Sequence, residues 1–173
     1  MVQTKLPEVW LRGPVANIPG LLQPVAHALL QAREEVNEML VNFPEDHLWN
    51  KPAGVASVGF HLQHLRGFID RLYTYAKGKA LNEEQLNALS LEGKPGENNI
   101  GVQELVQLFN VQVDKALQEL SETNVQTLYE QRDVGRIQLP STVFGLLVHS
   151  AEHAMRHVGQ LLVTVKVINH LLP

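Results

Sequence analysis

The sequence predicts an all-α protein, a four-helix bundle with long crossover connections. Two observations carry this prediction. Four stretches place apolar residues at the three- and four-residue intervals of a helix that buries one face. Clusters of proline, glycine and turn-forming residues separate these stretches. The length of 173 residues fits one domain with its own core, so we expect residues 1–173 to form a single domain.

The chain begins with an irregular arm, residues 1–19, because Pro7, Pro14 and Pro19 remove donors and favour extended backbone. We expect Trp10 and Leu11 to anchor this arm by burial. The first helix is predicted over residues 21–43, where Pro24 is tolerated in the first turn. A proline-containing loop follows, whose residues 48 and 49, leucine and tryptophan, should pack against the end of the helices.

Ser57 is the predicted N-cap of the second helix, which ends near Gly78. One face of this helix mixes polar and aromatic residues, which is typical of a lined cavity: Ser57, Phe60, His61, His64, Phe68, Arg71 and Tyr75. Asn82 and Gln85 predict a capping box for a short helix over residues 83–89. The glycine-rich stretch 93–99 then predicts an exposed excursion.

The third long helix is predicted over residues 101–120, and it contains no histidine. Residues 121–140 mix turn formers with apolar residues, and Asp133 to Gly135 could close a loose hairpin. Ser141 or Thr142 marks the start of the last helix, which continues to about His170. Its apolar residues lie on all sides, so we expect a central helix.

Composition excludes several classes of function. A formal charge of −4 gives no electrostatic footprint for nucleic acid. The chain has no cysteine, so a metal site must use histidine and carboxylates. The first residues carry no targeting pattern, and no run of about 18 apolar residues could cross a membrane. We therefore expect a soluble cytoplasmic protein.

Histidines cluster in two segments. His149, His153 and His157 recur every four residues, so a helix places them on one stripe, and His61 and His64 lie about ninety positions upstream. Two imidazoles one turn apart can bind one cation, with the third ligand coming from elsewhere. The alternative is that these histidines hydrogen-bond one another and buried water.

The runs from Ser57 to Leu65 and from His153 to Leu161, which includes His-x-x-x-His-x-Gly-Gln, resemble the DinB-like, or YfiT-like, family of damage-inducible proteins. The likeness covers nearly the whole chain and implies that family's bundle of four helices. It also implies that His64, His153 and His157 bind a divalent metal ion, zinc or nickel before iron. Relatives include thiol-dependent transferases, so a low-molecular-weight thiol is the implied co-substrate.

Three neutral histidines leave an open coordination position, which is typical of catalytic sites. We therefore expect a metal-dependent hydrolase or thiol transferase acting on a small molecule, with a non-catalytic metal-binding stress protein or a plain helical interaction module as alternatives. The candidate proton carriers are His61 and His149. Glu152 could orient an imidazole, and Arg156 or Arg71 could bind a substrate carboxylate. The resemblance also implies a homodimer.

Overall fold

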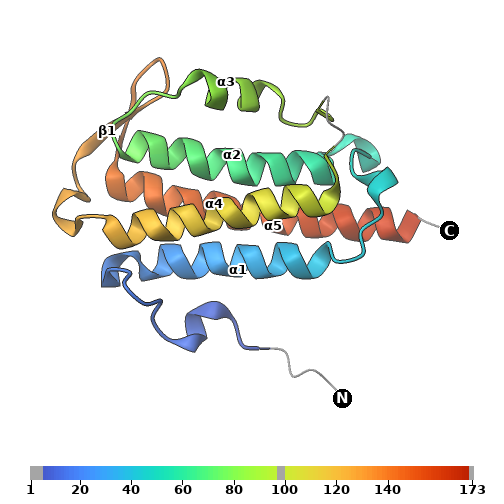
Figure 1. The fold of residues 1–173 in the computed structure, drawn as a ribbon, viewed down its shortest axis with the longest axis horizontal. Helices are drawn as coiled ribbons and strands as arrows, with labels where there is room; N and C mark the ends of the chain where they lie inside the picture. The colour runs from blue at the N-terminus through green and yellow to red at the C-terminus, as the bar shows by residue number, and fades with distance from the viewer. Residues whose placement is uncertain (1–5, 97–99, 172–173) are drawn as a thin grey trace.

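Four long helices build the core of the protein in a computed structural model, which describes residues 6–96 and 100–171. They are α1 (Gln23–Met39), α2 (Val58–Ala76), α4 (Val102–Glu122) and α5 (Val143–Leu171). Helices α2 and α5 share the most extensive contact, while α1 packs on α5, α4 packs on α2, and α1 and α4 contact each other (Figure 1). The predicted all-α fold is therefore confirmed in its main feature, a mostly helical chain.

The remaining elements lie outside this core. The short helix α3 (Glu83–Ser90) contacts α2 and buries none of its residues. Strands β1 (Gln131–Val134) and β2 (Leu139–Thr142) form an antiparallel hairpin in which Gln131 is opposite Thr142. The 3-10 turns are Val9–Arg12, Gly20–Leu22, Glu45–His47, Pro52–Gly54 and Val125–Thr127.

Side-chain caps fix where the helices begin. Ser57 Oγ accepts a hydrogen bond from the Phe60 amide at 3.1 Å, and Thr142 Oγ1 accepts one from the Gly145 amide at 3.0 Å. Asn82 and Gln85 form the predicted capping box, with both reciprocal bonds present. These are the cap residues predicted from the sequence, and each satisfies an amide that a helix start leaves free.

Helix α4 has a cap that comes from far away in the chain. Both carboxylate oxygens of Glu45 accept from the Val102 amide, at 3.1 and 2.8 Å. Gly101 makes room for this carboxylate, because a Cβ there would lie 3.1 Å from Glu45 Oε2. The negative charge also complements the positive end of the helix dipole.

The first helix is shorter than predicted, because residues 40–43 turn away ahead of Pro44. Pro44 disfavours the helical conformation at Phe43, so the helix could not extend to the predicted end.

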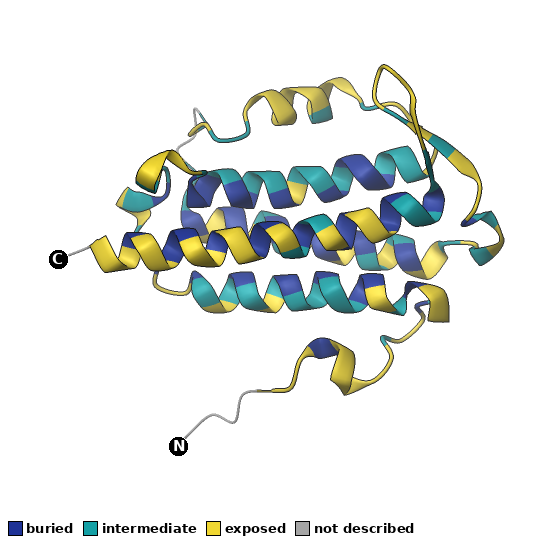
Figure 2. Cartoon of the chain, turned by 180° about the vertical axis from the view of Figure 1, so that it is seen from behind, coloured by how far each residue is buried: buried dark blue, intermediate teal, exposed yellow. Residues whose placement is uncertain are grey.

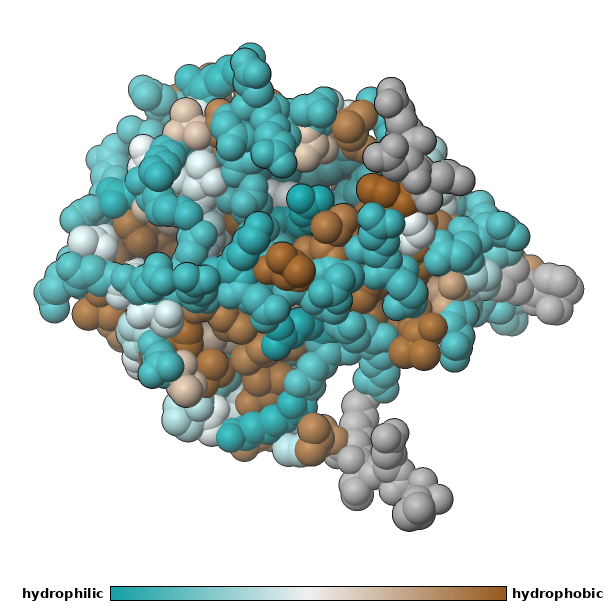
Figure 3. Space-filling model, viewed as in Figure 1, coloured by the Kyte–Doolittle hydropathy of each residue, from teal (hydrophilic) through white to brown (hydrophobic). Residues whose placement is uncertain are grey.

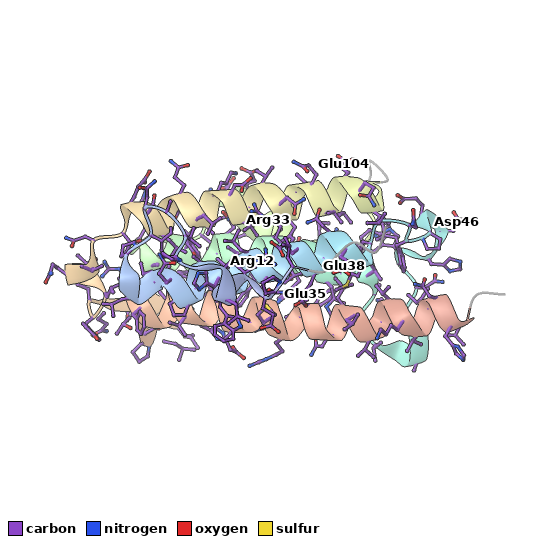
Figure 4. The ribbon with its side chains drawn as sticks, turned by 90° about the horizontal axis from the view of Figure 1, so that it is seen from below. Arg12, Arg33, Glu35, Glu38, Asp46 and Glu104 are labelled. Atoms are coloured by element: carbon purple, nitrogen blue, oxygen red, sulfur yellow. The ribbon has the colours of Figure 1, made fainter. Side chains whose placement is uncertain are left out.

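The arm is anchored by different residues than expected. Trp10 and Leu11 are 60% and 57% exposed, whereas Val9 is only 6% exposed and its amide bonds Gln31 Oε1 at 3.0 Å. The 3-10 turn over Val9–Arg12 directs Val9 inward and the next two side chains, Trp10 and Leu11, outward. Figure 4 shows Arg12 lying across α1, where it pairs with Glu34 at 2.7 Å. The expected anchors are therefore wrong, and residues 1–5 of the predicted arm lie outside the described part.

Helix α5 is also not buried on all sides. One face carries core residues such as Val158 and Leu161, each fully buried, while Val163 is 61% exposed and Val167 is 39% exposed. Figure 2 shows the exposed positions along its outward side. The all-round apolar pattern predicted a central helix because it does not distinguish a core face from an exposed apolar face.

Among the described helices, none is long and apolar enough to cross a membrane.

Candidate metal centre

Packing of α2 against α5 brings three histidines together. His64 comes from α2, and His153 and His157 lie one turn apart on α5. Each offers a ring nitrogen, and these atoms all lie within 4.8 Å of one another. Nε2 of His64 lies 3.0 Å from Nε2 of His153, and the His157 ring centroid lies 4.4 Å from that of His64. This is the triad predicted from the sequence, and its geometry is compatible with one shared cation.

A buried carboxylate holds the far side of the His64 ring. Glu92 Oε2 lies 2.6 Å from His64 Nδ1, and its Oε1 accepts a hydrogen bond from Arg71 Nη1 at 2.7 Å. The Glu92 side chain is 8% exposed. Because a carboxylate fixes Nδ1 as the protonated nitrogen, Nε2 of His64 is left as an acceptor toward the other two histidines.

Gly67 makes this ion pair possible. A Cβ at Gly67 would lie 2.6 Å from Arg71 Nη1 and 2.9 Å from Glu92 Oε1. A Cβ essentially never lies this close to another heavy atom, so any larger residue would shift the side chains of the pair. The glycine therefore supports the orientation of His64 through two further side chains.

His61 plays the corresponding role for His157. Its Nδ1 lies 3.1 Å from Nδ1 of His157, and the side chain is 2% exposed. Contact through Nδ1 leaves Nε2 of His157 available. His61 therefore lies behind the triad, in contact with a candidate ligand, and has almost no exposure through which to reach a substrate.

The protonation state of His153 and His157 suits the binding of a cation. Burial, with the charge of His64 as the next cause, lowers the pKa of His153 and of His157 from the usual 6.5 to about 4. Neutral imidazole is the form that ligates a metal. Nδ1 of His153 is buried and has no hydrogen-bond partner in the described residues, which leaves bonding capacity unmet. The residues present therefore fit a divalent metal ion.

Acid should destabilise the metal-free protein. Burial and the His64 charge also lower the pKa of His61 to about 4, whereas histidines of the unfolded chain protonate near about 6.5. Between these values the unfolded state binds more protons, so the free energy of unfolding falls as the pH drops from about 6.5 to about 4. Denaturant midpoints at pH 7 and pH 5 measure this.

His61→Leu should reduce the pH dependence, because it removes one of the groups that resist protonation. His170→Gln is the matched control, since His170 is exposed on the last turn of α5. A midpoint that rises toward pH 5 would contradict the assignment of these pKa values.

Two phenylalanines of α2 enclose the triad. Phe60 stacks on His64 with ring centroids 5.2 Å apart, and Phe68 stacks on His153 at 3.8 Å. Gly93 packs on Phe60 with φ of +80°, where a Cβ would meet the Phe60 ring at 3.2 Å. Aromatic walls limit water beside the ring nitrogens and strengthen electrostatic interactions there.

The other predicted site residues lie at the edge. His149 is exposed, and its Nδ1 lies 3.1 Å from Glu152 Oε2. Glu152 also pairs with Arg156, so its carboxylate contacts His149 and Arg156, and within the described residues it forms no hydrogen bond with His153. Arg71 pairs with Glu92 through Nη1, and Arg156 pairs with Glu152. With His153, the pair His149 and Glu152 forms a second, more exposed group of possible ligands.

Sequence reasoning missed Glu92. It lies between α3 and the stretch 93–99 that was expected to be an exposed excursion, yet its carboxylate is buried. Burial raises the pKa of Glu92, but hydrogen bonds from His64 and Arg71 outweigh this and hold the pKa below its usual range. The adjacent Gly93, which allows a tight approach to α2, was the available signal. Residues 97–99 of that excursion lie outside the described part.

Comparisons with known proteins identify the family and the fold. The sequence profile of the DinB superfamily matches residues 28–161, a span that includes both histidine segments. A crystal structure of a Streptococcus pneumoniae protein from a structural genomics programme is similar in fold, with a TM-score of 0.63 and 12% identity. The similarity covers 90% of this chain and 93% of that one. No curated protein matches the sequence significantly. The chain belongs to the DinB superfamily.

Proposed function

We propose that this protein is a divalent-metal-dependent enzyme in which His64, His153 and His157 hold the metal. The observation that carries the proposal is the convergence of these rings within 4.8 Å, with Glu92 and His61 on the outer nitrogens of two of them. Metal-binding histidines usually have such outer partners. The scaffold in this proposal is a single-domain four-helix bundle of α1, α2, α4 and α5, in which each helix packs on two others.

The proposed reaction class follows from a three-histidine donor set. Such a set leaves a position for water or substrate, and a bound divalent metal lowers the pKa of water or a thiol. The chain has no cysteine, so a thiol would be a low-molecular-weight co-substrate. We therefore propose hydrolysis or thiol transfer on a small molecule. Zinc or nickel suits the imidazoles, as does iron.

The protein's own residues supply orientation and proton transfer in this scheme. Phe60 and Phe68 shield the triad, and Glu92 keeps the proton of His64 on Nδ1. His149 is exposed at the edge, with its ring centroid 5.4 Å from that of His153. We therefore assign to His149 the acceptance of a proton from the nucleophile, with Glu152 in contact with its Nδ1.

The second candidate is a non-catalytic metal-binding stress protein. It is favoured by the group formed by His149, Glu152 and His153, which places two additional donors beside the triad. Protein ligands that close the coordination shell would leave no position for a substrate. The two candidates therefore differ in whether solvent or a thiol can reach the metal.

Comparing turnover by the metal-loaded and the metal-free protein distinguishes the enzyme from the non-catalytic binding protein. We expect zinc- or nickel-loaded protein to accelerate attack of a small thiol on an electrophile, or hydrolysis of an activated ester, and chelation to abolish this. His64→Ala should lose both metal and turnover, whereas the exposed His170→Ala should lose neither. Absence of metal-dependent turnover, together with spectroscopy of a cobalt-loaded sample showing no exchangeable ligand, would favour the binding protein.

His149 and His61 should behave differently. His149→Ala should retain metal and lower turnover by about 100-fold, the size of a general-base contribution. His61→Phe should weaken metal affinity by about 10-fold or more, because it removes the contact with His157 Nδ1. Metal content and turnover rates of the two variants measure this. Equal loss of metal in both would identify His149 as a ligand instead.

We also propose a cytoplasmic homodimer with no nucleic-acid or membrane partner. The exposed apolar side chains of α5, including Leu162, Val163 and Val167, support an interface between copies. Sedimentation equilibrium tests this, with Val163→Lys expected to yield monomers. A monomeric wild-type protein would contradict the dimer.

A further inference from the structure

A cavity of about 360 Å³ lies between α2, α3 and α4, beside the metal centre but without any of its histidines. Its walls include Trp49, Leu62, Leu105 and Leu108, so much of the lining is apolar. Figure 3 shows apolar groups reaching the surface among hydrophilic neighbours on the side of the molecule that carries α3 and α4. The volume lies within the range of small-molecule pockets.

Two buried polar side chains line this cavity. Arg71 and Gln112 are 7% and 6% exposed. Arg71 donates from Nη1 to Glu92, and its other guanidinium N–H groups bond no residue in the described ranges. Gln112 likewise forms no hydrogen bond with a described residue. No unpaired nitrogen or oxygen of Arg71 or Gln112 is fully enclosed by the protein. Because both side chains line the cavity, their unused donors face it. Buried polar groups are rarely left without partners.

Three basic and three acidic side chains line the cavity, so its formal charge is balanced, and the preference for an anion rests on the unused donors of Arg71 and Gln112. Asp70 and Glu92 line it, but each already accepts hydrogen bonds from within the protein, from Gln85 and from Arg71 and His64. By contrast, Arg66 and Lys115 form no ion pair with any residue of 6–96 or 100–171, and they line the same cavity. Glu84, the remaining acid, lies in the first turn of α3, where the helix dipole partly offsets its charge.

We propose that this cavity binds a small organic carboxylate with an apolar body. The carboxylate accepts hydrogen bonds from the spare guanidinium donors of Arg71 and from the amide of Gln112. Planar guanidinium groups recognise carboxylates well. The apolar body lies against Trp49 and the leucines. The site is distinct from the metal centre, although Arg71 and Glu92 form part of the wall between them.

Hexanoate is a suitable probe, with fluorescence of Trp49 as one readout. The chain has two tryptophans, so Trp10→Phe leaves Trp49 as the only emitter, and Trp10 is exposed on the arm. In metal-free protein we expect saturable binding at one site by fluorescence and by calorimetry. Neutral hexanamide should bind at least about tenfold more weakly than hexanoate, since it cannot form the charge-assisted hydrogen bond.

Arg71→Gln and Gln112→Leu should each weaken hexanoate binding, the first by about tenfold or more. Arg33→Gln is the matched control, because Arg33 is an arginine of α1 that pairs with Asp114 away from the cavity. Circular dichroism confirms folding, and Gln112→Leu adds no buried polar group. Equal affinity for hexanamide, or unchanged binding in both cavity variants, would overturn the proposal, as would absence of saturable binding.

The test does not depend on the proposed function. Hexanoate binding is measured without metal and repeated in His153→Ala, which removes a triad ligand but no cavity residue. Retained binding in that variant supports a separate site. Loss of binding there would show that the carboxylate occupies the histidine site instead.

Discussion

His153→Ala and His157→Ala should each reduce the affinity for a divalent cation by more than about 100-fold, because loss of an outer partner alone costs 10–100-fold. His64→Ala should do the same. Each residue supplies one ring nitrogen to the cluster, so its removal leaves two donors and a site that no longer surrounds the ion. Competition with a chelator of known affinity measures the change, and wild-type protein should hold about one ion per chain.

His170→Ala is the control on the same helix, because His170 is exposed near the end of α5. It should keep the full affinity. If His153→Ala and His157→Ala both kept their metal content, the histidines would be a hydrogen-bonded cluster and the metal proposal would fail. Nε2 of His64 and of His153 already lie 3.0 Å apart, so that alternative has a specific structure.

Local signals predicted most helix boundaries. Ser57 and Asn82 act as the predicted caps, and Thr142 is the cap of the two candidates, Ser141 and Thr142, because a cap depends on residues only three positions away. The triad was predicted for a related reason. Four-residue spacing puts His153 and His157 on one stripe whatever the tertiary structure, and the family resemblance supplied His64 from α2.

Long-range contacts could not be predicted in this way. Glu45 caps α4 from 57 positions upstream, and Glu92 reaches His64 across 28 positions. Nothing in the periodicity near either acid indicates its partner. Burial at Val9 rather than Trp10 has the same origin, since only the packing of the arm on α1 decides which side of a 3-10 turn faces inward.

Two acidic residues, Glu92 and Glu152, are candidates for the residue that orients the metal ligands. The sequence favoured Glu152 because it adjoins His153, but helical neighbours point in different directions. In the structure Glu152 is exposed and contacts His149 and Arg156, whereas Glu92 is buried against His64. The difference in burial predicts that only Glu92 strongly affects the metal.

Glu92→Gln should therefore weaken metal binding by about 10–100-fold, while Glu152→Gln should change it by less than about threefold. The amide of the substituted side chain has nearly the same shape as the carboxylate of Glu92, but it lacks the negative charge that makes His64 a stronger metal ligand. It also leaves Arg71, which is 7% exposed, without its ion partner, so the melting temperature of the metal-free protein should fall as well.

Metal affinity of the two variants, measured by chelator competition after circular dichroism has confirmed folding, decides between the acids. A larger effect of Glu152→Gln would show that the exposed acid orients the site through His149. An unchanged affinity in Glu92→Gln would mean that the 2.6 Å contact with His64 only stabilises the packing of the α3–α4 connection on α2. Loss confined to Glu92→Gln would instead establish that a residue distant in sequence sets the donor strength of the histidine triad.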